Sequence, residues 1–353
     1  MPTLRLMLKV EPLIHSIKTA IACMIGALIT IALAYLFKLP ASPWIVMSII
    51  VVMCSQIYVG SVIYKAYLRF LGTVVGCLFA VIALVFFGHT NLITTLTVGL
   101  SSLIFSYLAT TKENISYAGT LGAATTAVIL LSASPTLFLA GTRFFEISIG
   151  ILIATLISQF VMPIHARSHL RRTQAQTLEQ LSQYFATCVK FADQPSQQPS
   201  QHEELDEIII QTLSKQRLLA KEAKREPLGD IFDPAHFLQS LHCEKEMLRA
   251  VSLMHQTISH IKHQGVISSA LLKTFNETVL ASLKILVNAI ETGEPQQQPI
   301  HILPLKSLKE DLEQYAQLLT SEERTYVDSF VFAAETFTTH LLNLARLYNV
   351  PVS

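Results

Sequence analysis

Two ionisable residues, Arg143 and Glu146, stand close together in an otherwise apolar stretch of the chain. Residues three apart lie on one face of a helix, so the two side chains are within reach of each other. An ionisable side chain in hydrocarbon costs at least ~2.5–3.5 kcal/mol on insertion scales, so each needs a partner or a function. Two interpretations stay open. The pair is structural, near the outer membrane interface, or Arg143 binds an anionic solute while Glu146 holds the arginine or takes a proton.

A second polar group begins another apolar stretch. Arg69 and Thr73 are one helical turn apart, and Gly72 and Gly76 form a GxxxG pair, which permits close contact between helix backbones. This pattern predicts either a helix-packing interface with an arginine on the cytoplasmic side, or a cytoplasmic entrance to a transport path that attracts anions.

The run 119–126 is rich in small and hydroxyl side chains, and it includes Thr125 and Thr126. Such residues can line a polar path across a membrane. They can equally well pack helices tightly, as we expect for Gly150 in a later segment.

The elements that position these residues follow from the composition. Apolar residues make up 51% of the chain and charged residues only 14%, well below the ~25% of an ordinary globular protein. Residues 1–163 hold only 8 of the 26 Lys and Arg and 3 of the 25 Asp and Glu, so the charges are concentrated in residues 164–353. This split predicts a transmembrane domain over 1–163 and a water-soluble domain over 164–353, and it gives no sign of nucleic-acid binding.

A bilayer core about 30 Å thick needs roughly 20 helical residues. Six apolar stretches separated by short turn-like breaks predict a bundle of six transmembrane helices, near 14–37, 43–59, 68–87, 91–109, 117–132 and 137–162. Lys and Arg, Lys18 among them, gather at the start of the first span, between spans 2 and 3, between spans 4 and 5, and after the sixth. Because cytoplasmic loops carry the excess of positive charge, both termini are predicted to be cytoplasmic.

The second half is predicted to be a cytoplasmic all-α bundle. Apolar residues recur at helical spacing between about 168 and 349, interrupted by polar loops near 194–201 and 293–299. A seventh span over 328–349 is rejected, because Asp328, Glu335 and Arg346 would have to enter the membrane.

No sequence pattern indicates an enzyme, a metal site or a cofactor. The five cysteines are scattered, and neither a nucleotide-binding glycine loop nor a catalytic motif is present. We therefore expect a protein without cofactor or metal whose partners are the lipid bilayer and a solute.

Two stretches resemble a known family. The segment 64–76 (YKAYLRFLGTVVG) is similar to the K-A-x-x-R-x-x-G-T-x-x-G signature of the fusaric acid resistance and aromatic acid exporter superfamily. The segment 141–163, with Arg143, Glu146, Gly150 and Pro163, resembles the R-x-x-E-x-x-x-G … P ending of that family's six-span block.

The resemblance implies an exporter of aromatic or other small organic acids in a bacterial inner membrane, working in some systems with a periplasmic adaptor. Many bacterial members carry two six-span blocks, whereas this chain carries one, so a homodimer is expected to supply the second. The related aluminium-activated malate transporters are dimeric anion channels, which makes a passive organic-anion channel an alternative. A second alternative is a non-transporting membrane scaffold whose cytoplasmic bundle docks a partner.

Overall fold

In the computed structural model the chain is all-α, as predicted. The structure describes residues 2–38, 42–88, 90–193, 200–227, 232–258, 260–261, 269–294, 296, 298–314 and 319–352. The predicted linker 194–201 lies largely outside these ranges, as do two residues of the loop 293–299. The chain divides into two compact units, Met1–Ala166 with Arg225–Gly229, and Arg167–Lys224 with Asp230–Ser353.

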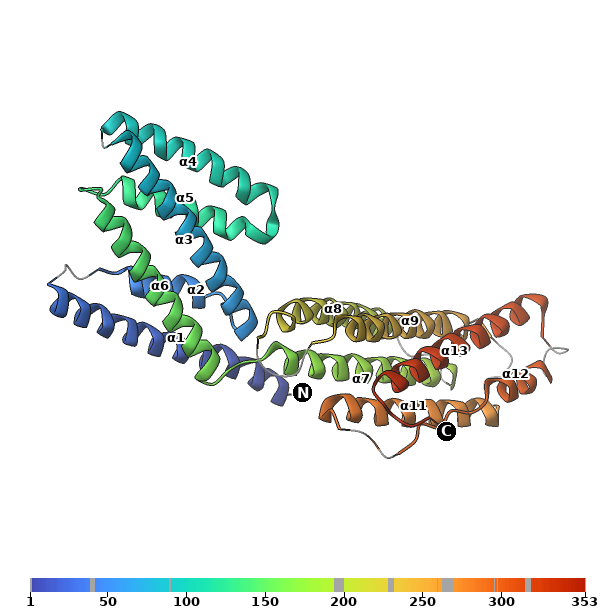
Figure 1. Cartoon of the computed structure of the whole chain (residues 1–353). Helices are drawn as coiled ribbons and strands as arrows, with labels where there is room; N and C mark the ends of the chain where they lie inside the picture. The colour runs from blue at the N-terminus through green and yellow to red at the C-terminus, as the bar shows by residue number, and fades with distance from the viewer. Residues whose placement is uncertain are drawn as a thin grey trace. The chain divides into compact units, whose positions relative to one another are not determined.

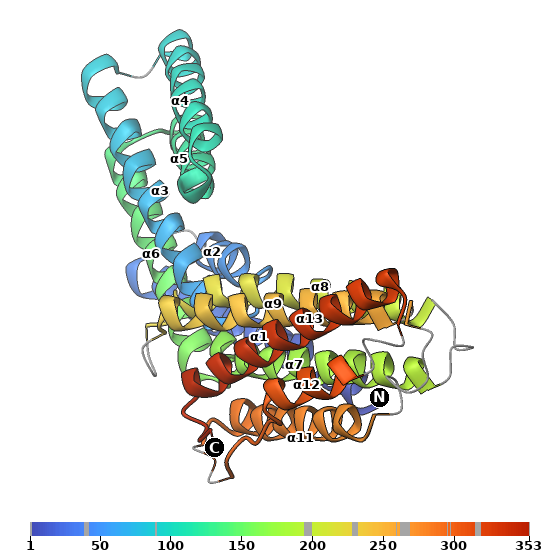
Figure 2. The same cartoon turned by 90° about the vertical axis from the view of Figure 1, so that its right-hand side faces the viewer.

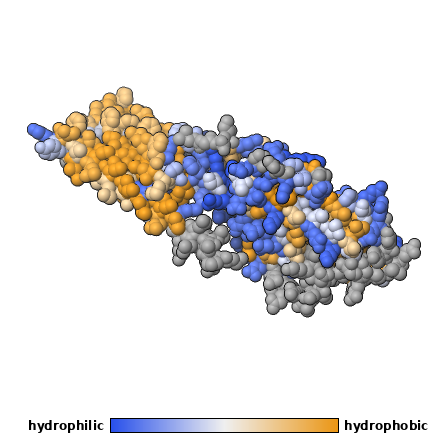
Figure 3. Space-filling view, turned by 90° about the horizontal axis from the view of Figure 1, so that it is seen from below, coloured by the Kyte–Doolittle hydropathy of each residue, from blue (hydrophilic) through white to orange (hydrophobic). Residues whose placement is uncertain are grey.

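The first unit holds six apolar helices (Figures 1 and 2). They are α1 (Pro2–Phe37), α2 (Trp44–Met53), α3 (Val59–Phe87), α4 (Asn91–Thr111), α5 (Ser116–Leu130) and α6 (Leu137–Phe160). Hydrophobic residues dominate its surface in Figure 3, and many large apolar side chains there are exposed. A soluble protein does not leave so much apolar surface in water, so this surface fits a lipid environment.

Four of these helices are long and apolar enough to cross a membrane: Val10–Phe37, Val59–Phe87, Asn91–Thr111 and Leu137–Phe160. At 1.5 Å per residue, α2 with 10 residues and α5 with 15 are shorter than a ~30 Å hydrocarbon core. Crossing at all six positions therefore stays a prediction. The predicted boundary between spans 2 and 3 is misplaced, because the chain turns at residues 54–58 and α3 begins at Val59.

Helix α3 occupies the middle of the first unit, where it packs on α5 and α6, while α2 packs on α6. Glycines allow these close approaches. A Cβ on Gly72 would lie 2.5 Å from the carbonyl oxygen of Ala118, and one on Gly76 would lie 2.6 Å from that of Gly122. Similarly, a Cβ on Gly150 of α6 would lie 2.5 Å from the carbonyl oxygen of Ile45 in α2. The three glycines named from the sequence thus stand where helix backbones nearly touch.

Arg225 and Glu226, which follow α8 in the sequence, belong to the first unit. The buried carboxylate of Glu226 accepts a hydrogen bond from the amide of Ala166, a few residues after α6 ends. The guanidinium of Arg225 lies 3.9 Å from the ring centroid of Tyr64 in α3. A short piece of the second half of the sequence is therefore fastened to α3 and to the segment that follows α6.

The second unit contains α7 (Ala166–Asp193), α8 (Ser200–Ala223), α9 (Pro234–Ile258), α11 (Ala270–Thr292), α12 (Leu305–Gln314) and α13 (Ser321–Leu347). Its apolar core includes Phe185 of α7, whose ring stacks on Phe337 of α13 at 5.4 Å and meets Phe275 of α11 edge-on. Figure 2 shows α13 running along α9, with which it makes extensive contact. In Figure 3 hydrophilic residues prevail over this unit's visible surface.

A polar group lies inside this second core. The carboxylate of Glu244 in α9 is fully buried and accepts hydrogen bonds from Gln216 Nε2 at 2.6 Å and from Ser240 Oγ at 3.3 Å. Burial raises the pKa of Glu244 from 4.5 to about 8, partly opposed by these two bonds. The carboxyl group is therefore mainly neutral in the folded protein at pH 7.

We expect the contact of α3 with α5 at Gly72 and Gly76 to be destabilised by one added methyl group. Gly72→Ala should lower the midpoint of thermal unfolding in detergent, because the Ala118 carbonyl must move, and overpacking typically costs about 1–3 kcal/mol. Gly99→Ala in α4 is the matched control, since nothing lies within 4 Å of the position that its Cβ would take, and alanine favours a helix. Equal midpoints for the two variants would contradict the close contact of α3 with α5.

We expect the stability of the second unit to fall as the pH rises from about 4.5 to about 8. The pKa of Glu244 is higher in the folded than in the unfolded chain, so its contribution is complete below the unfolded value and is lost as the pH passes the folded one. The loss is on the order of a few kcal/mol. Labelling of the buried Cys188 thiol, identified by peptide mass spectrometry, measures this opening.

Glu244→Gln serves as the comparison, because its amide stays neutral at every pH. The ratio of wild-type to variant labelling rates should rise from about pH 4.5 to about pH 8 and then level off, since the intrinsic pH dependence of the thiol cancels in the ratio. A ratio independent of pH would show that Glu244 titrates normally.

Candidate functional site

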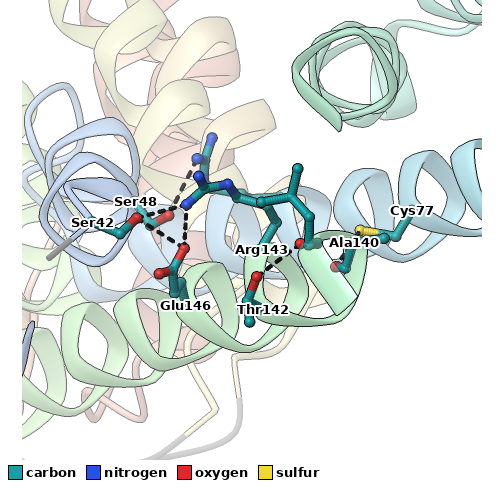
Figure 4. A network of polar contacts seen from close by, with 9 residues as sticks. Ser42, Ser48, Cys77, Ala140, Thr142, Arg143 and Glu146 are labelled. Atoms are coloured by element: carbon teal, nitrogen blue, oxygen red, sulfur yellow. Dashed lines mark hydrogen bonds and ion pairs between the residues drawn. The ribbon is translucent and has the colours of Figure 1, made fainter. Parts of the chain in front are cut away.

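Arg143 and Glu146 form a closed polar triangle with Ser42. Arg143 Nη1 donates hydrogen bonds to Glu146 Oε2 at 2.7 Å and to Ser42 Oγ at 2.6 Å, and Ser42 Oγ donates to Glu146 Oε2 at 3.0 Å. Figure 4 shows the three side chains converging. Both charged side chains keep 21% of their surface exposed, so the pair is accessible without being fully solvated.

The local sequence explains this placement. Helix α6 is capped by the Thr136 hydroxyl, which accepts from the amide of Leu139. Arg143 and Glu146 then lie in the second and third turns, one above the other on the same face. Ser42 comes just before α2, and the guanidinium of Arg143 also lies 5.3 Å from the ring centroid of Trp44, in the range of a cation–π contact. One arginine thus joins the start of α2 to the start of α6.

A hollow of about 580 Å³ opens beside the triangle. Its polar wall residues are Glu146, Ser42, Thr142 and Thr30. The rest is mainly apolar and comes from α1, the start of α2 and the start of α6, including Leu33, Phe37, Phe138, Phe145 and Ile149. A largely apolar hollow with a few convergent polar groups is the usual form of a small-molecule site. Glu146 is the one ionisable residue that lines this hollow, and Arg143 adjoins it through its hydrogen bonds to Glu146 and Ser42.

Arg69 lies deeper, with 5% of its surface exposed. Its Nη2 donates to Ser48 Oγ of α2 at 3.2 Å, and its side chain also hydrogen-bonds to Tyr117 of α5. Its Nε has no partner among the described residues. A buried cation held only by neutral groups carries a large desolvation penalty, which an anionic ligand would offset.

The threonines do not join either arginine's site. The hydroxyl of Thr73 donates to the carbonyl of Arg69 at 2.8 Å, and that of Thr126 donates to the carbonyls of Gly76 and Gly122, both at 3.0 Å. Thr125 is buried as well. Of the six residues predicted to bind solute, only Glu146 lines the hollow, although Arg143 bonds to two of its wall residues.

Sequence reasoning missed the neutral partners. Ser42, Trp44, Ser48 and Tyr117 contact the two arginines, yet no spacing rule connects them with the arginines, because each lies outside the helix that carries the arginine it contacts. Of these four residues, only Trp44, as the single tryptophan of the chain, could have been singled out from the sequence alone.

Lys18 has a role that the charge count did not predict. The sequence pattern places it among the cytoplasmic cations, but it is fully buried, and its ammonium donates to the carbonyls of Ser158 and Met162 at 3.4 Å each. These carbonyls lie at the end of α6, where helices carry partial negative charge. Lys18 therefore ties α1 to the end of α6.

Trp44 offers a direct optical test of the triangle. Because it is the only tryptophan and Arg143 lies over its ring, the indole fluorescence reports on this contact. Arg143→Ala should change the intensity and shift the emission maximum of the protein in detergent. Lys112→Gln, at an exposed cation beyond α4, is the control and should leave the spectrum unchanged. Identical spectra for wild type and Arg143→Ala would rule out the Arg143–Trp44 contact.

Among the described residues no group of three or more His, Cys, Asp or Glu side chains is arranged to hold a metal ion. None of the curated proteins matches the chain significantly. The model of the fusaric acid resistance protein family, by contrast, matches residues 12–325, which covers most of both units. That family is one of membrane transporters, and the apolar helices of the first unit agree with a multi-pass membrane protein. The resemblance found in the two sequence motifs is confirmed, and the chain belongs to the fusaric acid resistance protein family.

Proposed function

We propose that this protein exports aromatic or other small organic acids across a bacterial inner membrane. The observation that carries the proposal is the Arg143–Glu146–Ser42 triangle, of which Glu146 and Ser42 line a largely apolar hollow and Arg143 bonds to both. A cation within reach of an apolar surface suits a carboxylate attached to a ring. Membership of a transporter family supports movement of that solute across the membrane.

In the proposed mechanism Glu146 and the solute compete for Arg143. When Glu146 is ionised, it occupies the guanidinium and completes the triangle. When it takes a proton, its attraction for Arg143 weakens, and the carboxylate of the solute takes its place. Release of the solute and loss of the proton then restore the original pair. Because the anion and the proton are bound in the same state, this exchange moves them across the membrane in the same direction, and the solute and pH gradients together set that direction.

Helix α2 is proposed to lie along the path. Ser48 in α2 contacts Arg69, and Ser42, just before α2, contacts Arg143. An anion attracted by Arg69 would pass to Arg143 along this helix. In the proposed orientation both chain ends are cytoplasmic, because cytoplasmic loops gather Lys and Arg. Arg69 would then serve the inner side and Arg143 the outer side.

The remaining parts of the proposal concern assembly. A second copy of the chain is proposed to complete the path, because one chain holds half the number of apolar helices expected of a two-block member. The short helices α2 and α5 support this, since a neighbouring subunit can shield helices that are too short to span a bilayer alone. A periplasmic adaptor would continue the outward path.

The principal test is transport of labelled benzoate in proteoliposomes with an imposed pH gradient. Arg143→Ala should reduce flux at least about tenfold, towards that of empty vesicles, because the carboxylate loses its charge-assisted hydrogen bonds. Glu146→Gln should keep flux down the benzoate gradient but lose its dependence on the pH gradient, since glutamine takes up no proton. Lys112→Gln should transport as wild type.

Each alternative has its own outcome. Benzoate currents in planar bilayers that need no pH gradient would assign the protein to passive anion channels. Wild-type flux in Arg143→Ala, or a lowered melting temperature in Glu146→Gln with unchanged transport, would make the pair structural. A complete absence of flux in wild type would favour a scaffold.

A further inference from the structure

The surface of the second unit has a long groove between α8 and α9. Two adjoining hollows form it, one of about 520 Å³ and one of about 470 Å³, and they share Arg217 of α8 and Lys245 of α9 as wall residues. The residues of α8 that line it recur mostly every three or four positions from Asp206 onward, which places them on one face. We call this feature the α8–α9 groove.

Positive charge is concentrated in the groove. Five cationic side chains line it, against a single carboxylate, that of Asp206; the cations are Arg217, Lys221, Lys224, Lys245 and Arg249. Residues 164–353 hold 18 Lys and Arg and 22 Asp and Glu, which gives this part of the chain a net negative charge. The net charge of the groove is positive, the opposite sign. An even spread of charge over a solvated surface would not produce this contrast.

Among the described residues only one of these five cations has a counter-ion, namely Arg249, which pairs with Glu246. Arg217 and Lys245, like Lys221 and Lys224, form no ion pair there. Desolvation lowers the pKa of Lys245, and repulsion from Arg217 and Arg249 lowers it further, while Glu246 acts in the opposite sense. His242 and the carboxylate of Asp206 are the other ionisable groups along the walls. Arg217 and Lys245 therefore lie close enough to repel each other across the groove.

Below the cations the groove is apolar. Its floor is formed by Leu213 and Leu248 in the larger hollow and by Phe237 and Leu241 in the smaller one, each at most 8% exposed. The large apolar side chain of Ile210 is also part of the wall, with 49% of its surface exposed. Cations above an apolar floor are the features that recognise an amphipathic anion, since guanidinium binds the carboxylate and the floor takes up the hydrocarbon.

We propose that the α8–α9 groove binds a small organic anion, whose carboxylate pairs with Arg217 and Lys245 and whose apolar body lies on the floor. The ligand class follows from the groove alone, so the proposal does not rest on transport by the first unit. The site would let the second unit respond to the concentration of organic acids on its own side of the membrane.

The test is equilibrium binding of labelled 1-naphthoate to the full chain in nanodiscs of uncharged phosphatidylcholine. Arg217→Gln combined with Lys245→Gln, made in the Arg143→Ala protein so that the proposed membrane site does not contribute, should weaken binding at least about tenfold, because both charged partners of the carboxylate are gone. Lys284→Gln on α11, an exposed cation outside the groove, is the matched control and should bind as wild type.

Two further probes separate charge from apolar contact. Inorganic phosphate and 1-naphthalenemethanol should each bind at least about tenfold more weakly than 1-naphthoate. Phosphate carries the negative charge without the apolar body, and naphthalenemethanol has the apolar body without the charge. Equal binding of phosphate and naphthoate would overturn the proposal, as would vesicles of anionic lipid binding the chain where naphthoate does not.

The groove and the membrane site are also distinguishable. The Arg143→Ala protein should bind naphthoate in the groove with wild-type affinity even if transport is lost. Loss of all binding in Arg143→Ala, with unchanged binding when the Arg217 and Lys245 changes are made in the wild-type protein, would place the ligand in the first unit and refute the groove as a binding site.

Discussion

The cost of holding a charge in apolar surroundings governs the first unit. Three of its basic residues meet this cost in different ways. The ammonium of Lys18 donates hydrogen bonds to backbone carbonyls at the end of α6. Arg143 finds a carboxylate and a hydroxyl near the start of the same helix. Arg69 has a serine and a tyrosine, and one of its nitrogens stays without a partner among the described residues.

These solutions require helices to approach closely, which is why small residues accompany the charges. Gly72 and Gly76 bring α3 against α5, and Gly150 brings α6 against α2. The second contact places Ser42 within reach of Arg143, while Ser48 of α2 reaches Arg69 on α3. Glycine is needed there because even a methyl group would collide with a backbone oxygen. In this unit the close packing of helices therefore also places the polar partners of the charges. Ser42 can complete the polar triangle only while α2 and α6 stay in contact.

The second unit, whose visible surface is mainly hydrophilic (Figure 3), meets the same constraint differently. It places most charges at its surface, and a buried carboxyl such as that of Glu244 is held mainly neutral, with its pKa raised to about 8. It also gathers cations around Arg217 and Lys245, where solvent weakens their repulsion but does not abolish it. A bound anion in the proposed groove would relieve that repulsion. Organic anions would then meet two sites in one chain, one in each unit.

The sequence by itself determined the all-α class, the division into an apolar and a charged half, the family, and the pairing of Arg143 with Glu146. Each of these depends on composition or on spacing within one helix, which local periodicity fixes. It did not determine where α2 ends and α3 begins, because the cations that suggested a break, Lys65 and Arg69, lie inside α3, while the actual turn at residues 54–58 contains only the short polar pair Ser55 and Gln56. Only the tertiary structure decided that Ser42, Trp44 and Ser48 contact the arginines, and that Thr73 and Thr126 donate their hydroxyls to the backbone. Contacts between helices depend on which faces meet, and the sequence of a single helix does not contain that information.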